Sequence, residues 1–241
     1  MVKYKKWNPL KFGIFTGFIV YLIDSIVWFN LPAGNSYLAG TFIREYSIGG
    51  VYMPRPLGDY FWVKFGADFM MTFSYSMFAF GWLWIMFENF LKKNLKEVLL
   101  FTLLYFIFWM LIPLFSLIIP LNDTQVDTVR YMDTQMIAWS INLIVGYLFL
   151  SLIYGTKLFG SKKPKIILYV FIVGCVGALF MEFPLLVFGI RPTGILFLLY
   201  DVLFMLNQGA PYLYVIYDKI LPWLFVKIRK NSHKEIELTA Y

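Results

Sequence analysis

Three carboxylates of this chain fall inside apolar runs that are long enough to cross a membrane. Asp24, Glu182 and Asp201 lie within the runs 10–30, 166–190 and 194–219. A charge at the centre of a bilayer costs at least ~2.5 kcal/mol, so such residues usually face a protein interior and often serve function. These three acids are therefore the first candidates for chemistry.

Glu182 and Asp201 are predicted to lie on neighbouring helices. Only the short turn 191–194 separates their two apolar runs, which makes those runs antiparallel neighbours. Two carboxylates in different surroundings provide the minimum machinery for acid–base catalysis without a metal or cofactor. We assign the acid to Glu182, deep in its apolar run, and the ionised partner to Asp201, nearer the polar turn. Arg191, within that turn, is the nearest cationic partner of either acid along the sequence.

The three acids are also predicted to share one depth. At ~1.5 Å of helix rise per residue, all three lie about 9–12 Å below the outer boundary of the membrane. Asn142 falls in the same layer, and Asn207 lies one to two turns deeper. The sequence therefore predicts a polar layer in the outer half of the bundle. The candidate substrate-binding residues are Asp24, Asn142, Arg191, Tyr200, Asn207 and Tyr212.

Six apolar runs must position these residues, each near or above the ~20 residues that a membrane-spanning helix needs. They cover residues 10–30, 69–87, 98–120, 134–158, 166–190 and 194–219. The composition agrees, because 60% of the chain is hydrophobic and 15% is charged, whereas soluble domains are about 45–50% apolar and a quarter charged. We expect an all-α, polytopic fold: one transmembrane domain over residues 1–230, followed by a polar tail over 231–241.

The basic residues indicate an orientation. They cluster near the N-terminus, around 92–96 and 162–165, and after the last apolar run. These positions alternate along the chain, so the positive-inside rule predicts cytoplasmic N and C termini, most simply in the plasma membrane. Because the charges mark the ends of apolar runs and form no patch, we expect a lipid bilayer and no nucleic acid as the surroundings of this protein. The long outer connection 31–58 is predicted to be either a lid over the bundle or an exposed loop.

The last apolar run is predicted to be interrupted at Asn207-Gln208-Gly209-Ala210-Pro211. Proline cannot donate its backbone hydrogen bond, and broken helices at membrane depth persist where the freed groups line a polar cavity. Transporters build substrate sites from such breaks, although a plain proline kink is the commoner case. Pro184, two residues after Glu182, is expected to add a second irregularity.

Metal and cofactor chemistry find no support in the sequence. The chain has one cysteine, Cys175, and one histidine, His233, which lies in the polar tail. Zinc, copper and haem sites need more of these ligands, and we find no motif of a serine hydrolase, zinc protease or nucleotide motor. We therefore expect no metal and no cofactor.

Three functions remain open. The first is an intramembrane acid–base enzyme, such as a cyclase, isomerase or dehydratase, acting on an isoprenoid-, polyketide- or lipid-like substrate. Aromatic residues make up 21% of the chain and would suit an apolar or cationic guest. The second is a proton- or cation-coupled transporter, which the absence of a visible internal repeat disfavours. The third is a non-catalytic membrane subunit whose acids pair with a partner chain.

Overall fold

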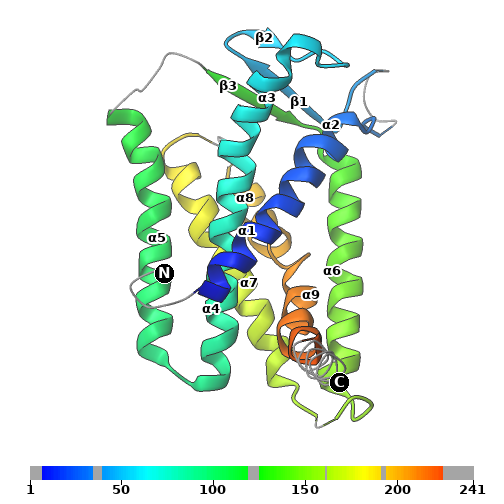
Figure 1. Cartoon of the computed structure of the whole chain (residues 1–241), viewed down its shortest axis with the longest axis vertical. Coiled ribbons are helices and arrows are strands. Elements are labelled where there is room, and N and C mark those ends of the chain that lie inside the picture. The colour runs from blue at the N-terminus through cyan, green and yellow to red at the C-terminus, as the bar shows by residue number, and fades with distance from the viewer. Residues whose placement is uncertain (1–6, 35–39, 119–124, 161, 191–193, 225–241) are drawn as a thin grey trace, which may run out of the picture.

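The computed structural model describes residues 7–34, 40–118, 125–160, 162–190 and 194–224. The chain is mostly helical, and its long helices stand side by side in a bundle (Figure 1). Five helical segments are long and apolar enough to cross a membrane: Trp7–Asn30, Gly58–Phe90, Leu95–Phe115, Met132–Gly155 and Lys165–Val187. This is the architecture of a multi-pass membrane protein.

The first two segments are composite helices. The first joins α1 (Trp7–Leu22), a π-helical turn (Ile23–Val27) and α2 (Trp28–Asn30). The second joins a 3-10 turn (Gly58–Tyr60), α3 (Phe61–Asp68), a π-helical turn (Phe69–Phe73) and α4 (Ser74–Lys92). The remaining long helices are α5 (Leu95–Ile118), α6 (Met132–Gly155) and α7 (Lys165–Val187). The second segment begins well before residue 69, because the aromatic stretch ahead of it is also helical.

The sixth predicted run is not one continuous helix. It contains α8 (Gly194–Phe204), α9 (Ala210–Val215) and a π-helical turn (Ile216–Ile220). Residues 205–209 between α8 and α9 form turns, so the predicted interruption is present. Pro184, by contrast, does not interrupt α7, which continues to Val187. Proline this close to a helix end removes little of the hydrogen-bond ladder.

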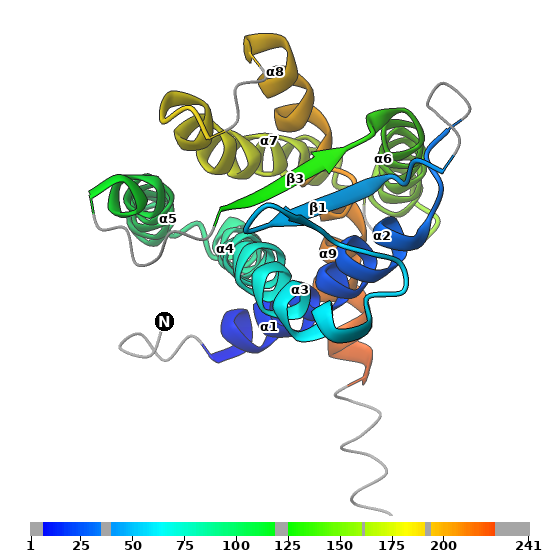
Figure 2. The same cartoon turned by 90° about the horizontal axis from the view of Figure 1, so that it is seen from above.

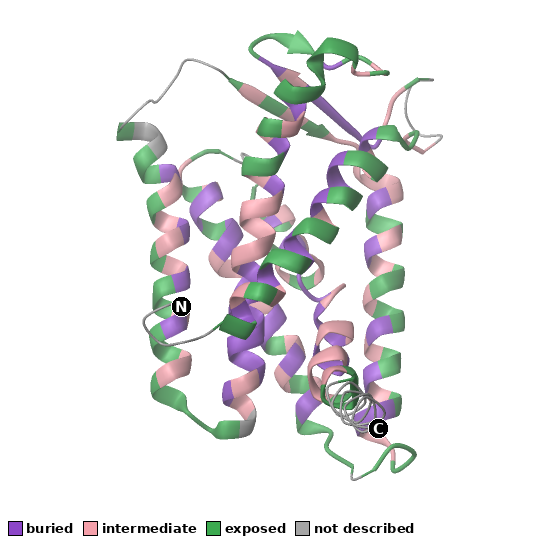
Figure 3. Cartoon of the chain, viewed as in Figure 1, coloured by how far each residue is buried: buried purple, intermediate pink, exposed green. Residues whose placement is uncertain are grey.

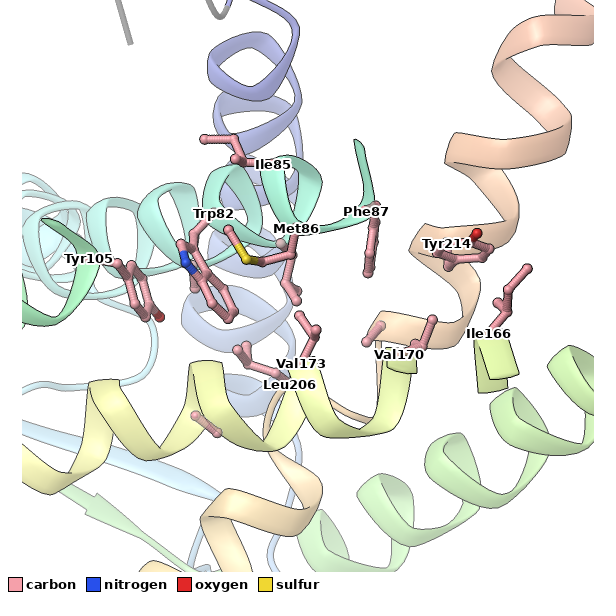
Figure 4. Packing of buried hydrophobic residues seen from close by; sticks show 14 of the residues in the cluster. Trp82, Ile85, Met86, Phe87, Tyr105, Ile166, Val170, Val173, Leu206 and Tyr214 are labelled. Carbon is pink, nitrogen blue, oxygen red and sulfur yellow. The ribbon is translucent and has the colours of Figure 1, made fainter. Parts of the chain in front are cut away.

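Helix α4 lies at the centre of the bundle and packs against α1, α5 and α7. Every residue from Gly81 to Phe87 is buried, so this stretch has no lipid-facing side. Trp82, Met86 and Phe87 meet side chains of α5, α7 and α9 in the main hydrophobic cluster (Figure 4). Helices α5 and α6 instead carry long exposed faces (Figure 3), as expected where helices meet lipid.

A three-stranded sheet covers one end of the bundle, and an all-α fold did not anticipate it. It consists of β1 (Arg44–Ile48), β2 (Val51–Tyr52) and β3 (Val126–Arg130) in the order β2-β1-β3. Both pairings are antiparallel, and Arg44 faces Arg130 across β1 and β3. Seen from above, these two strands cross the end of the bundle (Figure 2). Strands β1 and β2, which belong to the connection 31–58, therefore lie over this end of the bundle.

The basic connections lie at the other end. The links 92–96 and 162–165 are at the end of the bundle opposite the sheet (Figure 1). Their placement is compatible with the positive-inside prediction, which puts the sheet outside the cell.

Candidate functional site

A cavity of about 430 Å³ lies between the sheet and the helices. Its volume is within the range of about 300–1,000 Å³ that small-molecule sites occupy. Strands β1 and β3 each supply one arginine to its lining, and all of the long helical segments except α5 contribute to it. The polar and charged lining residues are Asp24, Arg44, Thr72, Tyr75, Ser76, Arg130, Gln135, Asn142, Glu182, Gln208 and Tyr212.

Asp24 is held by an ion-pair cluster at the sheet. It belongs to the π-helical turn between α1 and α2 and is buried. Its Oδ2 pairs with the guanidinium of Arg44, lies 3.9 Å from Nη2 of Arg130, and accepts a hydrogen bond of 3.2 Å from the Thr72 hydroxyl. The charge that the bilayer would penalise is therefore compensated from outside the helices, by the sheet.

Arg55 fixes the strand that carries Arg44. Its guanidinium donates to the backbone carbonyls of Phe29 and Arg44, at 2.8 Å each. It also stacks over the rings of Phe29 and Phe42, at 3.9 and 4.0 Å from their centroids. A planar cation can make both kinds of contact at once. Arg55 thus links the end of α2 to β1 and sets the position of Arg44 in the cavity.

A second buried ion pair, between Lys64 and Asp68 of α3, lies beside this cluster. Lys64 donates to the backbone carbonyl of Ser25 at 2.7 Å, and its ammonium lies 4.4 Å from the ring centroid of Phe29. Tyr46 of β1 presents its ring to the same ammonium, at 4.8 Å. This pair binds α3 to the Asp24 turn and the sheet.

Burial also keeps Tyr46 neutral. It raises the pKa of the Tyr46 phenol well above its usual range; Asp68 adds to the rise, whereas Arg44 opposes it. The hydroxyl therefore stays protonated at physiological pH and serves as a polar but uncharged neighbour of the two ion pairs.

Glu182 and Asn142 share the cavity with Asp24. Glu182 lies near the end of α7 and is buried, and Asn142 belongs to α6. Tyr212 of α9 lines the same space, where its hydroxyl donates to the backbone carbonyl of Asn142 at 3.1 Å. The structure thus brings together four of the residues that the sequence selected.

Asp201 and Tyr200 take other positions. Asp201 is buried in α8 but is not among the described residues that line the cavity. The ring of Tyr200 stacks on Trp139, with centroids 6.1 Å apart and planes at 9°, and on Phe204 at 4.5 Å. Because Trp139 is itself a lining residue, Tyr200 supports the cavity wall from behind. Arg191 lies outside the described residues.

Asn207 connects helices and does not line the cavity. Its side chain is completely buried, and its Oδ1 accepts a hydrogen bond of 2.6 Å from the Tyr147 hydroxyl of α6. Its Nδ2 donates to the Leu203 carbonyl at 3.1 Å and to the Cys175 sulfur of α7 at 3.2 Å. Asn207 therefore ties the broken segment to both neighbouring helices, which is a structural role.

Sequence reasoning missed Arg44, Arg130, Gln135 and Gln208. The two arginines lie outside the apolar runs, where basic residues are read as topology signals. Their only sequence signal is that they are cations in connections predicted to lie outside the cell, away from the basic clusters. Gln208 lies in the predicted helix interruption but was not selected as a binding residue, and Gln135, an uncharged residue near the start of an apolar run, gave no signal.

Among the residues that the structure describes, no three histidine, cysteine or acidic side chains are grouped so as to hold a metal ion. The arrangement can instead bind an amphiphilic molecule, with ion-paired and amide groups at the polar positions and Trp28, Phe80 and Trp139 among the apolar walls. Searches against protein-family models, curated proteins and solved structures find no match to this chain.

Proposed function

We propose that this chain is a multi-pass membrane enzyme that binds an apolar or amphiphilic small molecule in the cavity and transfers protons to and from it through Glu182. One observation carries the proposal: two carboxylates, Asp24 and Glu182, line the same cavity. Asp24 is ion-paired with Arg44 and accepts a hydrogen bond from Thr72, so we assign it a role in positioning the substrate. Glu182 follows Met181 on the cavity wall of α7, which suits contact with the substrate.

Proton transfer alone supports several reactions of apolar molecules. Protonation at one carbon of a double bond and removal of a proton from another carbon isomerises the substrate with no net change in protons. Protonation of a hydroxyl, loss of water and removal of a proton from the adjacent carbon dehydrate the substrate. In a cyclisation, protonation of one double bond starts attack by a second double bond, and loss of a proton from carbon ends the reaction. Aromatic walls stabilise the positive charge that develops in such steps. The substrate class is isoprenoid-, polyketide- or lipid-like.

Asp201 takes a secondary place in this proposal. It does not line the described cavity, so direct contact with a substrate is assigned to Glu182. The predicted pairing of Glu182 and Asp201 remains a hypothesis in which Asp201 acts through its neighbour.

The experiment compares the wild type with Glu182→Gln and with Glu97→Gln, a control outside the cavity. Each protein is purified in nanodiscs and incubated with an extract of apolar metabolites from the producing cells. Mass spectrometry and chromatography then follow both the bound and the free molecules. Gln keeps the shape of Glu but cannot cycle a proton, so Glu182→Gln should abolish turnover and retain a bound substrate, while Glu97→Gln should behave as wild type.

Two results would contradict the proposal. One is a Glu182→Gln protein that is folded and converts the extract as the wild type does. The other is loss of the folded protein in Glu182→Gln, but not in Glu97→Gln, which would indicate that Glu182 holds the bundle together. Thermal unfolding of each variant separates these two results.

A proton- or cation-coupled carrier is the second candidate, favoured by one observation. The turns between α8 and α9 supply Met205, Leu206, Gln208 and Gly209 to the lining of the cavity, and broken helices form the substrate sites of many transporters. A carrier would bind a molecule from the extract and release it chemically unchanged. Uptake of that molecule into sealed proteoliposomes would then distinguish the carrier from the enzyme.

A further inference from the structure

The two arginines of the sheet form an unusual end to the cavity. Arg44 and Arg130 occupy facing register positions on β1 and β3, and both line the cavity. Both approach the same carboxylate oxygen, that of Asp24. Two guanidinium groups thus meet one carboxylate at this end of the cavity, whose lining also includes the carboxylate of Glu182.

Other acids of this region are engaged elsewhere. Glu45 follows Arg44 on β1, and because successive strand residues point to opposite faces, its side chain leaves the cavity side. It accepts hydrogen bonds of 3.4 Å from the backbone of Phe42 and from the Tyr131 hydroxyl. Asp68 is paired with Lys64 of its own helix. Neither acid lines the cavity.

An arginine pair of this kind is suited to an oxyanion. Guanidinium groups bind carboxylates and phosphates through two parallel hydrogen bonds, and this geometry makes Arg the preferred residue for such groups. The Arg130 side chain is 26% exposed, and its Nη2 lies 3.9 Å from Oδ2 of Asp24, which is longer than a hydrogen bond. Its donors can therefore turn to a ligand while Arg44 stays with Asp24.

We propose that the Arg44–Arg130 end of the cavity is a subsite for the oxyanion group of an amphiphilic ligand whose apolar body lies against Trp28, Phe80 and Trp139. The ligand class is an alkyl or prenyl chain that ends in a carboxylate or a phosphate. This inference rests on the proposed function, because it names the substrate class of the same cavity. The proposal places the apolar body of the ligand, and not its anionic end, against Glu182.

The test measures binding of three probes with chains of equal length: dodecanoate, dodecyl phosphate and dodecanol. The protein is held in phosphatidylcholine nanodiscs, and tryptophan fluorescence reports binding because Trp28 and Trp139 line the cavity. Both anions, or one of them, should bind about tenfold more tightly than the alcohol, which corresponds to one charge-assisted hydrogen bond. The anion that binds more tightly identifies the headgroup as carboxylate or phosphate.

The decisive variant is Arg130→Gln, because Arg130 is the more exposed of the two arginines. It should weaken anion binding about tenfold and leave dodecanol unchanged, whereas Arg130→Lys should weaken it less. Lys162→Gln, an exposed position at the opposite end of the bundle, controls for attraction of anions to any cationic protein surface. Equal binding of all three probes, or equal losses in Arg130→Gln and Lys162→Gln, would overturn the subsite.

Failure of the subsite and failure of the proposed function give different results. Glu182→Gln should keep the preference for anions, because Glu182 is not part of the subsite. An intact preference together with unchanged turnover in Glu182→Gln supports the subsite and contradicts the enzyme. If the wild type does not prefer anions but Glu182→Gln loses turnover, the subsite is contradicted and the proposed enzyme is supported.

Discussion

Asp24 is stabilised in the bundle by residues that are distant from it in sequence. Its partners come from β1, from β3 and from the π-helical turn before α4. Taking one charge away from a buried ion pair usually destabilises a protein more than deleting both partners, because it leaves the other charge uncompensated. The cost of changing Asp24 should therefore reflect the arginines as much as the acid.

Asp24→Asn should lower the free energy of unfolding by roughly 3–5 kcal/mol, the range for breaking a buried ion pair. Thr72→Val is the matched control: it removes only the 3.2 Å hydrogen bond to the same oxygen and should cost about 1 kcal/mol. Reversible unfolding in mixed micelles measures both. Equal losses in the two variants would mean that the ion pair contributes no more than a single hydrogen bond.

At this scale the sequence predicts positions better than partners. Helix rise alone placed Asp24, Asn142 and Glu182 in one layer, and all three line one cavity. It could not assign the partner of Asp24, because neither arginine lies on a predicted helix. Asp201 was predicted at the same depth, yet it is not among the described lining residues. Depth gives the height of a residue in the membrane but not the direction in which its side chain points.

Among the helices, the contact of α1 with α4 depends on two glycines one turn apart. A Cβ at Gly17 would lie 3.1 Å from the backbone nitrogen of Met77 and the carbonyl oxygen of Phe73, and one at Gly13 would overlap the carbonyl oxygen of Met77. Small residues four apart let membrane helices approach closely and gain van der Waals contact. The Gly13-xxx-Gly17 spacing is thus a packing signal that the sequence does contain.

Gly13→Ala should therefore separate α1 from α4 and lower the free energy of unfolding by about 1–3 kcal/mol, as overpacking does. The same substitution at Gly66 of α3 is the control, because a Cβ there meets nothing within 4 Å. Gly66→Ala should instead stabilise the helix by about 0.5–1 kcal/mol. Comparable stability of the two variants in thermal unfolding would show that the α1–α4 contact tolerates a methyl group.

Elements differ in how far the sequence predicts them. The break between α8 and α9 was predictable because glycine and proline act locally. The sheet was not, because β1 and β3 are five residues each and the second lies beyond α5 in the chain. Strand pairing over such a separation depends on the tertiary structure and not on local propensity.

The two ends of the molecule differ in structure and in charge. The sheet and the cavity lie at one end, and the basic connections lie at the other. Hydropathy predicts the long helices well, since a bilayer demands apolar runs of fixed length. It assigned six of them, whereas five segments are long enough and the last is divided. The length of the last apolar run suggested a sixth span, although its glycine and proline marked the position where the helix is interrupted.

Orientation can be tested with cysteines in a Cys175→Ser background. We expect Asp59→Cys, exposed near the sheet, to react with a membrane-impermeant maleimide in intact cells, because the positive-inside rule puts the sheet outside. Lys163→Cys, exposed in the connection between α6 and α7, should react only after the cells are permeabilised. The opposite labelling pattern would invert the topology and place the sheet in the cytoplasm.

The sheet also has a consequence for synthesis. Asp24 leaves the ribosome first, Arg44 follows with β1, and Arg130 follows only after α3, α4 and α5 have been made. During this interval Asp24, in the first helical segment of the nascent chain, lacks the full set of its arginine partners. A chain truncated after α5 would keep β1 and β2 but lack β3, which pairs with the other edge of β1 and carries Arg130. The cluster therefore makes maturation of the first helix depend on translation of the second half of the protein.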